Sequence, residues 1–101
     1  MKDHNYFVYI ITNPIKTVLY IGVTNNLDIR LQQHYDNRGE PETFAGRYFC
    51  YNLLYWERFQ YIDHAIEREK ELKKWSRIKK ERLINEFNKE WRFLNNDIRE
   101  K

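Results

Sequence analysis

The feature that most constrains the fold is a pair of short β-rich runs, residues 7–12 and 18–22, followed at once by a helical pattern. Between the runs, Asn-Pro-Ile-Lys at 13–16 has asparagine at the first position and proline at the second, as type I turns prefer. Two strands joined by so short a turn pair antiparallel. The chain is therefore expected to begin with a β-hairpin.

The turn also predicts a strand register. If residues 13–16 form the turn, Thr12 faces Thr17 and Tyr9 faces Tyr20 directly across the hairpin. Because side chains alternate between the faces of a strand, both tyrosines are expected on the same face of the sheet. Taken alone, each tyrosine also fits a purely structural role as a half-buried residue of the sheet.

A helix is predicted over residues 27–36. Leu27, Arg30, Leu31 and His34 follow the spacing of a single helical stripe, with the two polar side chains one turn apart. The leucines make this stripe the buried side of the helix. We therefore expect Arg30 and His34 to point toward the sheet rather than toward open water.

The rest of the chain predicts a loop over 36–43 that continues through 44–47, a third strand over 53–59, and helices over 62–76 and 78–87. We expect one α+β domain over residues 1–101, with its core at about 5–87. Trp91 and the pair Phe93-Leu94 lie in the C-terminal tail, 88–101, and are expected to pack back onto the core. A content of 42% hydrophobic residues argues against disorder.

Several classes of protein are excluded by composition. The longest apolar run, residues 6–11, is too short to span a bilayer. Residues 1–7 show no apolar signal pattern, so we expect no signal peptide. Cys50 is the single cysteine, so no intrachain disulfide or cysteine-rich zinc site is possible. We expect a cytoplasmic protein with no membrane partner.

Basic residues are concentrated in the second half of the chain. The net charge is +3, but residues 68–82 hold eight basic and three acidic side chains, a local charge of +5. Such a stretch either binds the phosphate backbone of a nucleic acid or forms a solvated helix face. The candidate nucleic-acid contacts are Lys73, Lys74, Arg77, Lys80 and, near the long loop, Arg47.

One carboxylate is out of place in the helix predicted over 62–76. Glu69 lies in the middle of an apolar stripe, where a charge is costly unless it is paired or coordinates a metal. Lys73 is one turn further on and offers a partner. Glu69 is therefore either half of a structural ion pair, the edge of a stripe exposed at a groove, or a metal ligand. The stripe consists of Ile62, Ala65, Ile66 and Leu72.

These motifs together resemble the GIY-YIG nuclease family, in particular its small single-domain YhbQ-like members. The matching segments are V-Y-I at 8–10, Y-I-G at 20–22, L-x-x-R-L-x-x-H at 27–34, A-I-x-R-E at 65–69, L-K-K-W-S-R-x-K-K at 72–80 and N-x-E-W-x-x-L at 88–94. The chain departs from the family pattern at Val8, where the family name has glycine. The resemblance implies a small three-stranded antiparallel sheet flanked by α-helices.

The resemblance also implies hydrolysis of nucleic-acid phosphodiester bonds with one divalent ion, Mg²⁺ or Mn²⁺. Glu69 would be the metal ligand, and Tyr20 would activate the attacking water or act in concert with a metal-bound hydroxide. Tyr9 would hydrogen-bond near Tyr20 and the scissile phosphate. Arg30 would hold the phosphate and stabilise its developing charge, a task that suits the planar guanidinium. His34 would assist proton transfer or orient a tyrosine.

Three functions compete at this point. The first is a metal-dependent endonuclease acting on DNA. The second is a nucleic-acid-binding module that does not cut, or that cuts only with a protein partner that also targets it. The third is a protein-interaction domain that presents Trp91 and Phe93, but such a domain has no need of a tyrosine, arginine and glutamate set. We adopt the endonuclease as the hypothesis.

Overall fold

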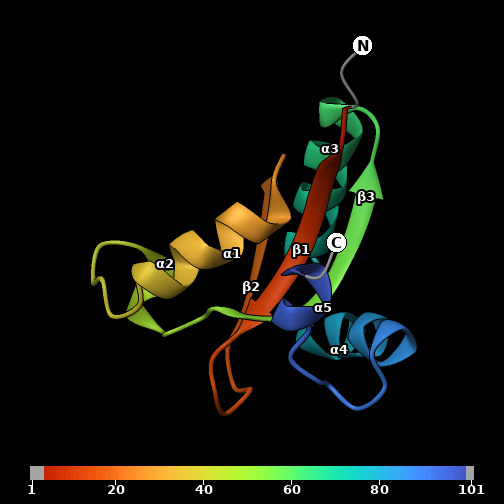
Figure 1. The fold of residues 1–101 in the computed structure, drawn as a ribbon. Coiled ribbons are helices and arrows are strands. Elements are labelled where there is room, and N and C mark those ends of the chain that lie inside the picture. Colours follow the sequence, from red (N-terminus) through yellow and green to blue (C-terminus); the bar gives the residue numbers. More distant parts are fainter. Residues whose placement is uncertain (1–3, 100–101) are drawn as a thin grey trace.

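The first strand of the chain lies at the centre of the sheet, with the hairpin partner on one side and the third strand on the other (Figure 1). The computed structural model describes residues 4–99. The order β2-β1-β3 is antiparallel throughout, as predicted. The elements are β1 (Tyr6–Thr12), β2 (Leu19–Thr24), α1 (Leu27–Asp36), α2 (Phe44–Arg47), β3 (Asn52–Phe59), α3 (Ile62–Lys73), α4 (Arg77–Phe87) and α5 (Asn95–Arg99).

The predicted hairpin register is wrong by two residues. Tyr9 faces Gly22, and Tyr20 faces Ile11. A shift of two positions preserves the alternation of side chains. Both tyrosines therefore still project from one face of the sheet, as expected, but as diagonal rather than direct neighbours.

The cause of the shift is the side chain of Asn13. The predicted turn forms, with the Lys16 amide donating to the Asn13 carbonyl at 3.0 Å. The Asn13 side-chain oxygen then accepts hydrogen bonds from the amides of Thr17 and Val18, at 2.8 and 3.0 Å. Because those two amides are held by Asn13, they do not join the ladder, and pairing starts at Leu19.

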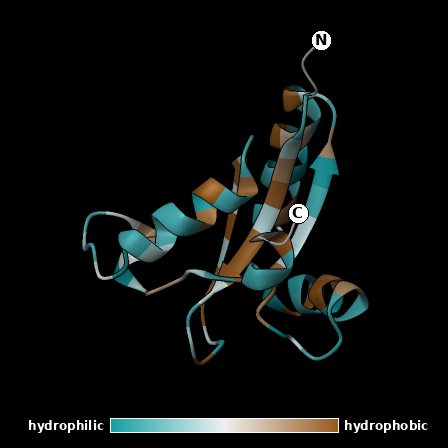
Figure 2. Cartoon of the chain, in the orientation of Figure 1, coloured by the Kyte–Doolittle hydropathy of each residue, from teal (hydrophilic) through white to brown (hydrophobic). Residues whose placement is uncertain are grey.

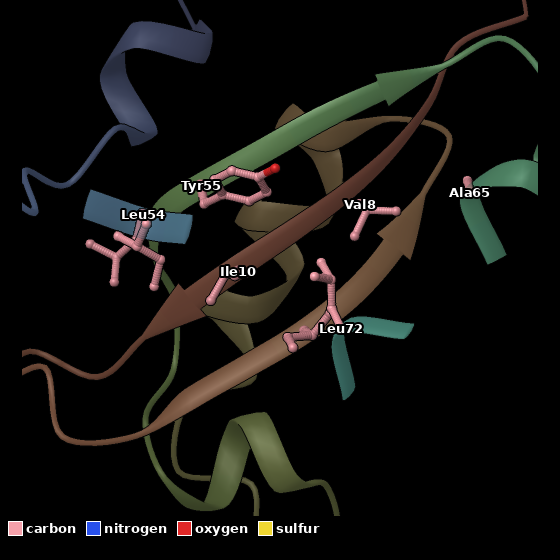
Figure 3. Packing of buried hydrophobic residues seen from close by; sticks show 8 residues of the cluster. Val8, Ile10, Leu54, Tyr55, Ala65 and Leu72 are labelled. Atoms are coloured by element: carbon pink, nitrogen blue, oxygen red, sulfur yellow. The ribbon is translucent and has the colours of Figure 1, made fainter. Parts of the chain in front are cut away.

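Each face of the sheet buries its own hydrophobic cluster. On one face, α3 and α4 pack over Val8, Ile10 and Leu54 (Figure 3). On the other face, α1, α2 and the C-terminal segment cover a second cluster around Tyr9, Ile11 and Leu53. Figure 2 shows hydrophobic segments along the central strand, where Ile10 and Ile11 are fully buried. The opposed clusters place α1 and α3 on opposite sides of one sheet.

The helix predicted over 62–76 ends earlier, at Lys73, because the Ser76 hydroxyl caps the next helix by accepting from the Lys79 amide at 3.2 Å. Ala65 and Leu72 form the buried stripe of α3, as predicted. Ile62 does not belong to it, since it lies at the first turn with 43% of its surface exposed.

The C-terminal tail packs back onto the sheet in part. Leu94 is buried, and its amide donates to the Leu53 carbonyl at 2.8 Å. Trp91 packs against the first cluster, but Phe93 is 39% exposed and departs from the prediction. Within residues 4–99, no helix has the length and apolar character needed to cross a bilayer.

Candidate active site

A buried hydrogen bond between the central strand and α1 organises the site. Tyr9 is 1% exposed, and its hydroxyl lies 2.8 Å from Nε2 of His34. His34 is held over the sheet because Leu27 and Leu31, on the same stripe of α1, are buried against it. The helix starts at a fixed point, since the Asn26 side chain caps it. The predicted stripe of α1 therefore faces the sheet.

The glycine of the second motif makes room for this tyrosine. Gly22 faces Tyr9 across the hairpin, and a Cβ added to Gly22 would lie 2.5 Å from Cζ of the tyrosine ring and nearer still to its hydroxyl. The ring thus occupies the space over Gly22 that another residue's side chain would fill. This contact explains why a glycine stands in the middle of β2, where glycine is otherwise unfavourable.

Burial sets the protonation state of the pair. It raises the pKa of Tyr9 to about 12, although the positive charge of Arg30 opposes this rise. It also lowers the pKa of His34 to about 4, and here the charge of Arg30 acts in the same direction. Both side chains are consequently neutral near pH 7. A neutral histidine cannot supply positive charge to a phosphate, which leaves that task to Arg30.

The depressed pKa of His34 predicts a loss of stability in acid. The unfolded chain binds a proton at His34 below about pH 6.5, whereas the folded chain binds it only near pH 4. The free energy of unfolding should therefore fall by about 3 kcal/mol as the pH drops through this window. His34→Gln should remove this part of the slope, as measured by urea unfolding at several pH values. An identical slope in both proteins would contradict the assignment.

Tyr20 lies at the exposed border of the same cluster, on the edge strand β2. Its ring meets the ring of His34 edge-on, with 5.6 Å between centroids, and stacks on Phe44 of α2 at 6.1 Å. Tyr20, Arg30, His34 and Phe44 line a hollow of about 130 Å³. The Arg30 guanidinium, which has five N–H groups, donates to the Gln33 side chain at 2.9 Å and also interacts with the Tyr9 hydroxyl.

Glu69 belongs to the other side of the sheet. Its side chain is 17% exposed, and Oε2 lies 3.1 Å from Nζ of Lys73, so the predicted ion pair forms. Its negative charge nevertheless contributes to the raised pKa of Tyr9. Lys73 and Tyr20 line a second hollow, of about 240 Å³, at the edge strand where the two faces meet. Glu69 therefore acts on Tyr9 through its charge, and its ion-pair partner Lys73 lines the hollow beside Tyr20.

The residue set predicted for the site offers a divalent cation one carboxylate ligand, that of Glu69. Among residues 4–99, no group of three or more histidine, cysteine, aspartate or glutamate side chains gathers at a single point. The donor set fits Mg²⁺, which usually keeps several waters and takes few protein ligands. The carboxylate of Glu69 is a hard oxygen donor of the required kind, and the ammonium of Lys73 now occupies the position of a counter-ion.

The predicted nucleic-acid contacts lie in different environments. Lys73 and Lys80 both line the hollow beside Tyr20. Lys74 is exposed at the end of α3. Arg77 donates to the Thr17 carbonyl at 2.9 Å, and Arg47 donates to the carbonyl of Pro41 at 2.9 Å. These arginines therefore brace loops of the protein itself.

Phe44 is a residue of this site that the sequence does not predict. Residues 44–47 are expected to continue the loop, yet they form the single turn α2, whose aromatic side chain walls both hollows. The available signal was local: Thr43 precedes the turn as a helix-capping residue, and its hydroxyl accepts from the Gly46 amide at 3.0 Å.

Comparison with known proteins gives a consistent assignment. The family model described as the GIY-YIG catalytic domain matches residues 5–82. A UPF0213 protein of Natronomonas pharaonis is 37% identical over 82 residues, covering 81% of this chain and 91% of that protein. One from Bacillus pumilus is 34% identical over 87 residues, covering 86% of each. The solution NMR structure of a UPF0213 protein from Bacillus halodurans is 32% identical, covers 80% of this chain and 83% of that one, and has a TM-score of 0.49.

Proposed function

Because this chain belongs to the GIY-YIG family, we propose that it is a metal-dependent endonuclease that hydrolyses DNA phosphodiester bonds. The observation that carries this proposal is the hollow at the sheet edge, where Tyr20 and Arg30 border the same space. A phenol and a guanidinium beside one opening are the groups that a phosphodiester substrate needs for nucleophile activation and charge stabilisation.

Each residue of the cluster has a role that follows from its position. Arg30 is half-buried and has further N–H donors for the phosphate oxygens. A phosphate can accept two parallel hydrogen bonds from the planar guanidinium. Tyr20, at the exposed border, would accept the proton of the attacking water as a phenolate, and the DNA oxygen that leaves the phosphorus would take up a proton from solvent. Tyr9 is too deeply buried to reach a phosphate. Tyr9 and His34 therefore act as positioning residues that hold α1, and with it Arg30, against β2.

Glu69 would hold the divalent ion, Mg²⁺ or Mn²⁺. Such an ion supplies positive charge near the reacting phosphate and polarises a bound water. Holding the ion requires the ammonium of Lys73 to leave its present position 3.1 Å from the carboxylate. A DNA phosphate is a natural new partner for Lys73, since this lysine lines the hollow beside Tyr20 together with Lys80. DNA binding and metal binding would therefore support each other.

The proposal predicts cleavage that depends on a divalent ion. Labelled duplex, branched and single-stranded DNAs should be incubated with the purified chain in Mg²⁺, in Mn²⁺ and in EDTA. We expect cut or nicked products with either ion and none in EDTA, as separated on a denaturing gel. Absence of product from every DNA with both ions would contradict the proposal.

One observation favours the second candidate, a nucleic-acid-binding module that does not cut without a partner. The carboxylate of Glu69 is already paired with Lys73, so the ion pair alone accounts for its place in α3. Such a module would bind DNA with a slope of about −0.9 in log K against log salt for each phosphate contacted. Binding with this slope, but without cleavage under any of the conditions above, would establish it.

A further inference from the structure

An exposed aromatic pair lies directly beside Tyr20. Phe44 is 51% exposed although its ring stacks on Tyr20, with 26° between the ring planes. The ring of Tyr48, which is also exposed, contacts Phe44 at 4.8 Å between centroids. Single exposed aromatic residues are common, but here two adjacent rings continue the surface of a candidate catalytic tyrosine.

The backbone that carries Phe44 is firmly fixed. The Gly39 amide donates to the Gly46 carbonyl at 2.8 Å, and Thr43 caps the turn. Gly46 itself is so closely packed that an added Cβ would lie 2.7 Å from the Glu40 carbonyl oxygen. Arg47 ties the far end of the turn to Pro41. The backbone position from which the Phe44 ring projects is therefore fixed by the fold.

Phe44 also separates two regions of positive charge. It walls the hollow that contains Arg30, and it walls the hollow that contains Lys73 and Lys80. A DNA strand that places one phosphate in each hollow must pass over the Phe44 ring between them. Each pair of successive phosphates is joined through one deoxyribose, and the base on that sugar is the group that can lie on the ring.

We propose that Phe44 is a base-stacking residue that selects DNA with an unpaired nucleotide beside the scissile phosphate. The position of that phosphate rests on the proposed function. A base within an intact duplex has both faces covered by its neighbours, so an aromatic ring can stack on it only after the base is extruded, at an energetic cost. The preferred substrates are therefore single strands, flaps or branch points rather than continuous duplex. Base–aromatic stacking is tolerant of sequence, so little base preference follows.

The test is binding without cleavage. Affinities of a fluorescently labelled single strand and of its duplex are measured in EDTA for the wild type, Phe44→Leu and Phe44→Trp. Leucine keeps the apolar cover on Tyr20 but cannot stack on a base. We expect Phe44→Leu to weaken single-strand binding about 10-fold, equivalent to about 1.4 kcal/mol, and duplex binding less than twofold. Phe44→Trp should retain or improve single-strand binding.

The matched control is Phe87→Leu. Phe87 is exposed to a similar extent, but it contacts Tyr55 and Trp56 of β3, on the opposite edge of the sheet from Tyr20. It should leave both affinities unchanged. An equal loss for single strand and duplex in Phe44→Leu, a loss in Phe44→Trp as large as in Phe44→Leu, or no loss in Phe44→Leu would overturn the stacking role.

The failure of this inference is distinguishable from failure of the proposed function. If the strand preference depends on Phe44 but no metal supports cleavage, the stacking role stands and the nuclease proposal fails. If cleavage is metal-dependent but Phe44→Leu binds single strands as the wild type does, the nuclease stands and the stacking role fails.

Discussion

Replacing Glu69 with glutamine should reduce DNA cleavage by about a thousandfold or more. The substitution keeps the size of the side chain but removes the negative charge that would hold the divalent ion. Metal ions contribute several kcal/mol of transition-state stabilisation, and each 1.36 kcal/mol is a factor of ten in rate. The measurement is single-turnover cleavage at saturating DNA. Glu67→Gln, a matched change at an exposed position of α3, should cut as the wild type does.

The structural alternative for Glu69 makes a different prediction. If the carboxylate serves only the ion pair, Lys73→Gln and Glu69→Gln break the same interaction and should behave alike. An i,i+4 pair of this kind contributes about 0.3–0.5 kcal/mol to stability, so both variants would fold and retain cleavage. If Glu69 holds the metal, Lys73→Gln weakens DNA binding but still cuts at saturating DNA, whereas Glu69→Gln does not.

Gly22→Ala should destabilise the chain by about 3 kcal/mol. The new methyl group would lie 2.5 Å from Cζ of Tyr9, whose ring is buried in the second hydrophobic cluster. Overpacking of this kind costs about 1–3 kcal/mol, and displacement of the ring also breaks its hydrogen bond to His34, worth about 1 kcal/mol. Urea unfolding monitored by circular dichroism measures the change.

A double-mutant cycle isolates the Gly22 contact. In a Tyr9→Leu background the obstructing ring is absent, so adding Gly22→Ala should cost much less than it does in the wild type. Equal costs in the two backgrounds, or a Gly22→Ala protein as stable as the wild type, would show that the ring is not held over Gly22 as described.

Elements with a strong local period were predictable from the sequence. The helix over residues 27–36 has the predicted bounds because its leucines, capping asparagine and polar stripe all agree. The hairpin register was not, since it depends on the Asn13 side chain taking two amides from the ladder. A turn motif in the sequence identifies where the chain reverses direction. It does not reveal how many residues stay outside the strand pairing.

In the candidate site, too, features within one helix were predictable and contacts between distant segments were not. The spacing of Arg30 and His34 predicted their common direction, and the interrupted stripe of α3 singled out Glu69. The hydrogen bond of His34 to Tyr9 could not be predicted from helical spacing, because it joins side chains 25 residues apart on different elements. Phe44 was missed because a single helical turn is too short to show a period. Contacts between distant segments were the part that only the structure supplied.

Metal-dependent cutting by the chain itself is the central claim, and one assay tests it most directly. The purified protein is incubated with labelled DNA in EDTA, sampled, and then given Mg²⁺ in excess of the chelator in the same tube. Glu69→Gln protein purified in parallel is treated identically. We predict no product before Mg²⁺ and a cut strand after it, from the wild type alone. Product that forms in EDTA, or at equal rates with both proteins after Mg²⁺, would contradict a nuclease site built on Glu69.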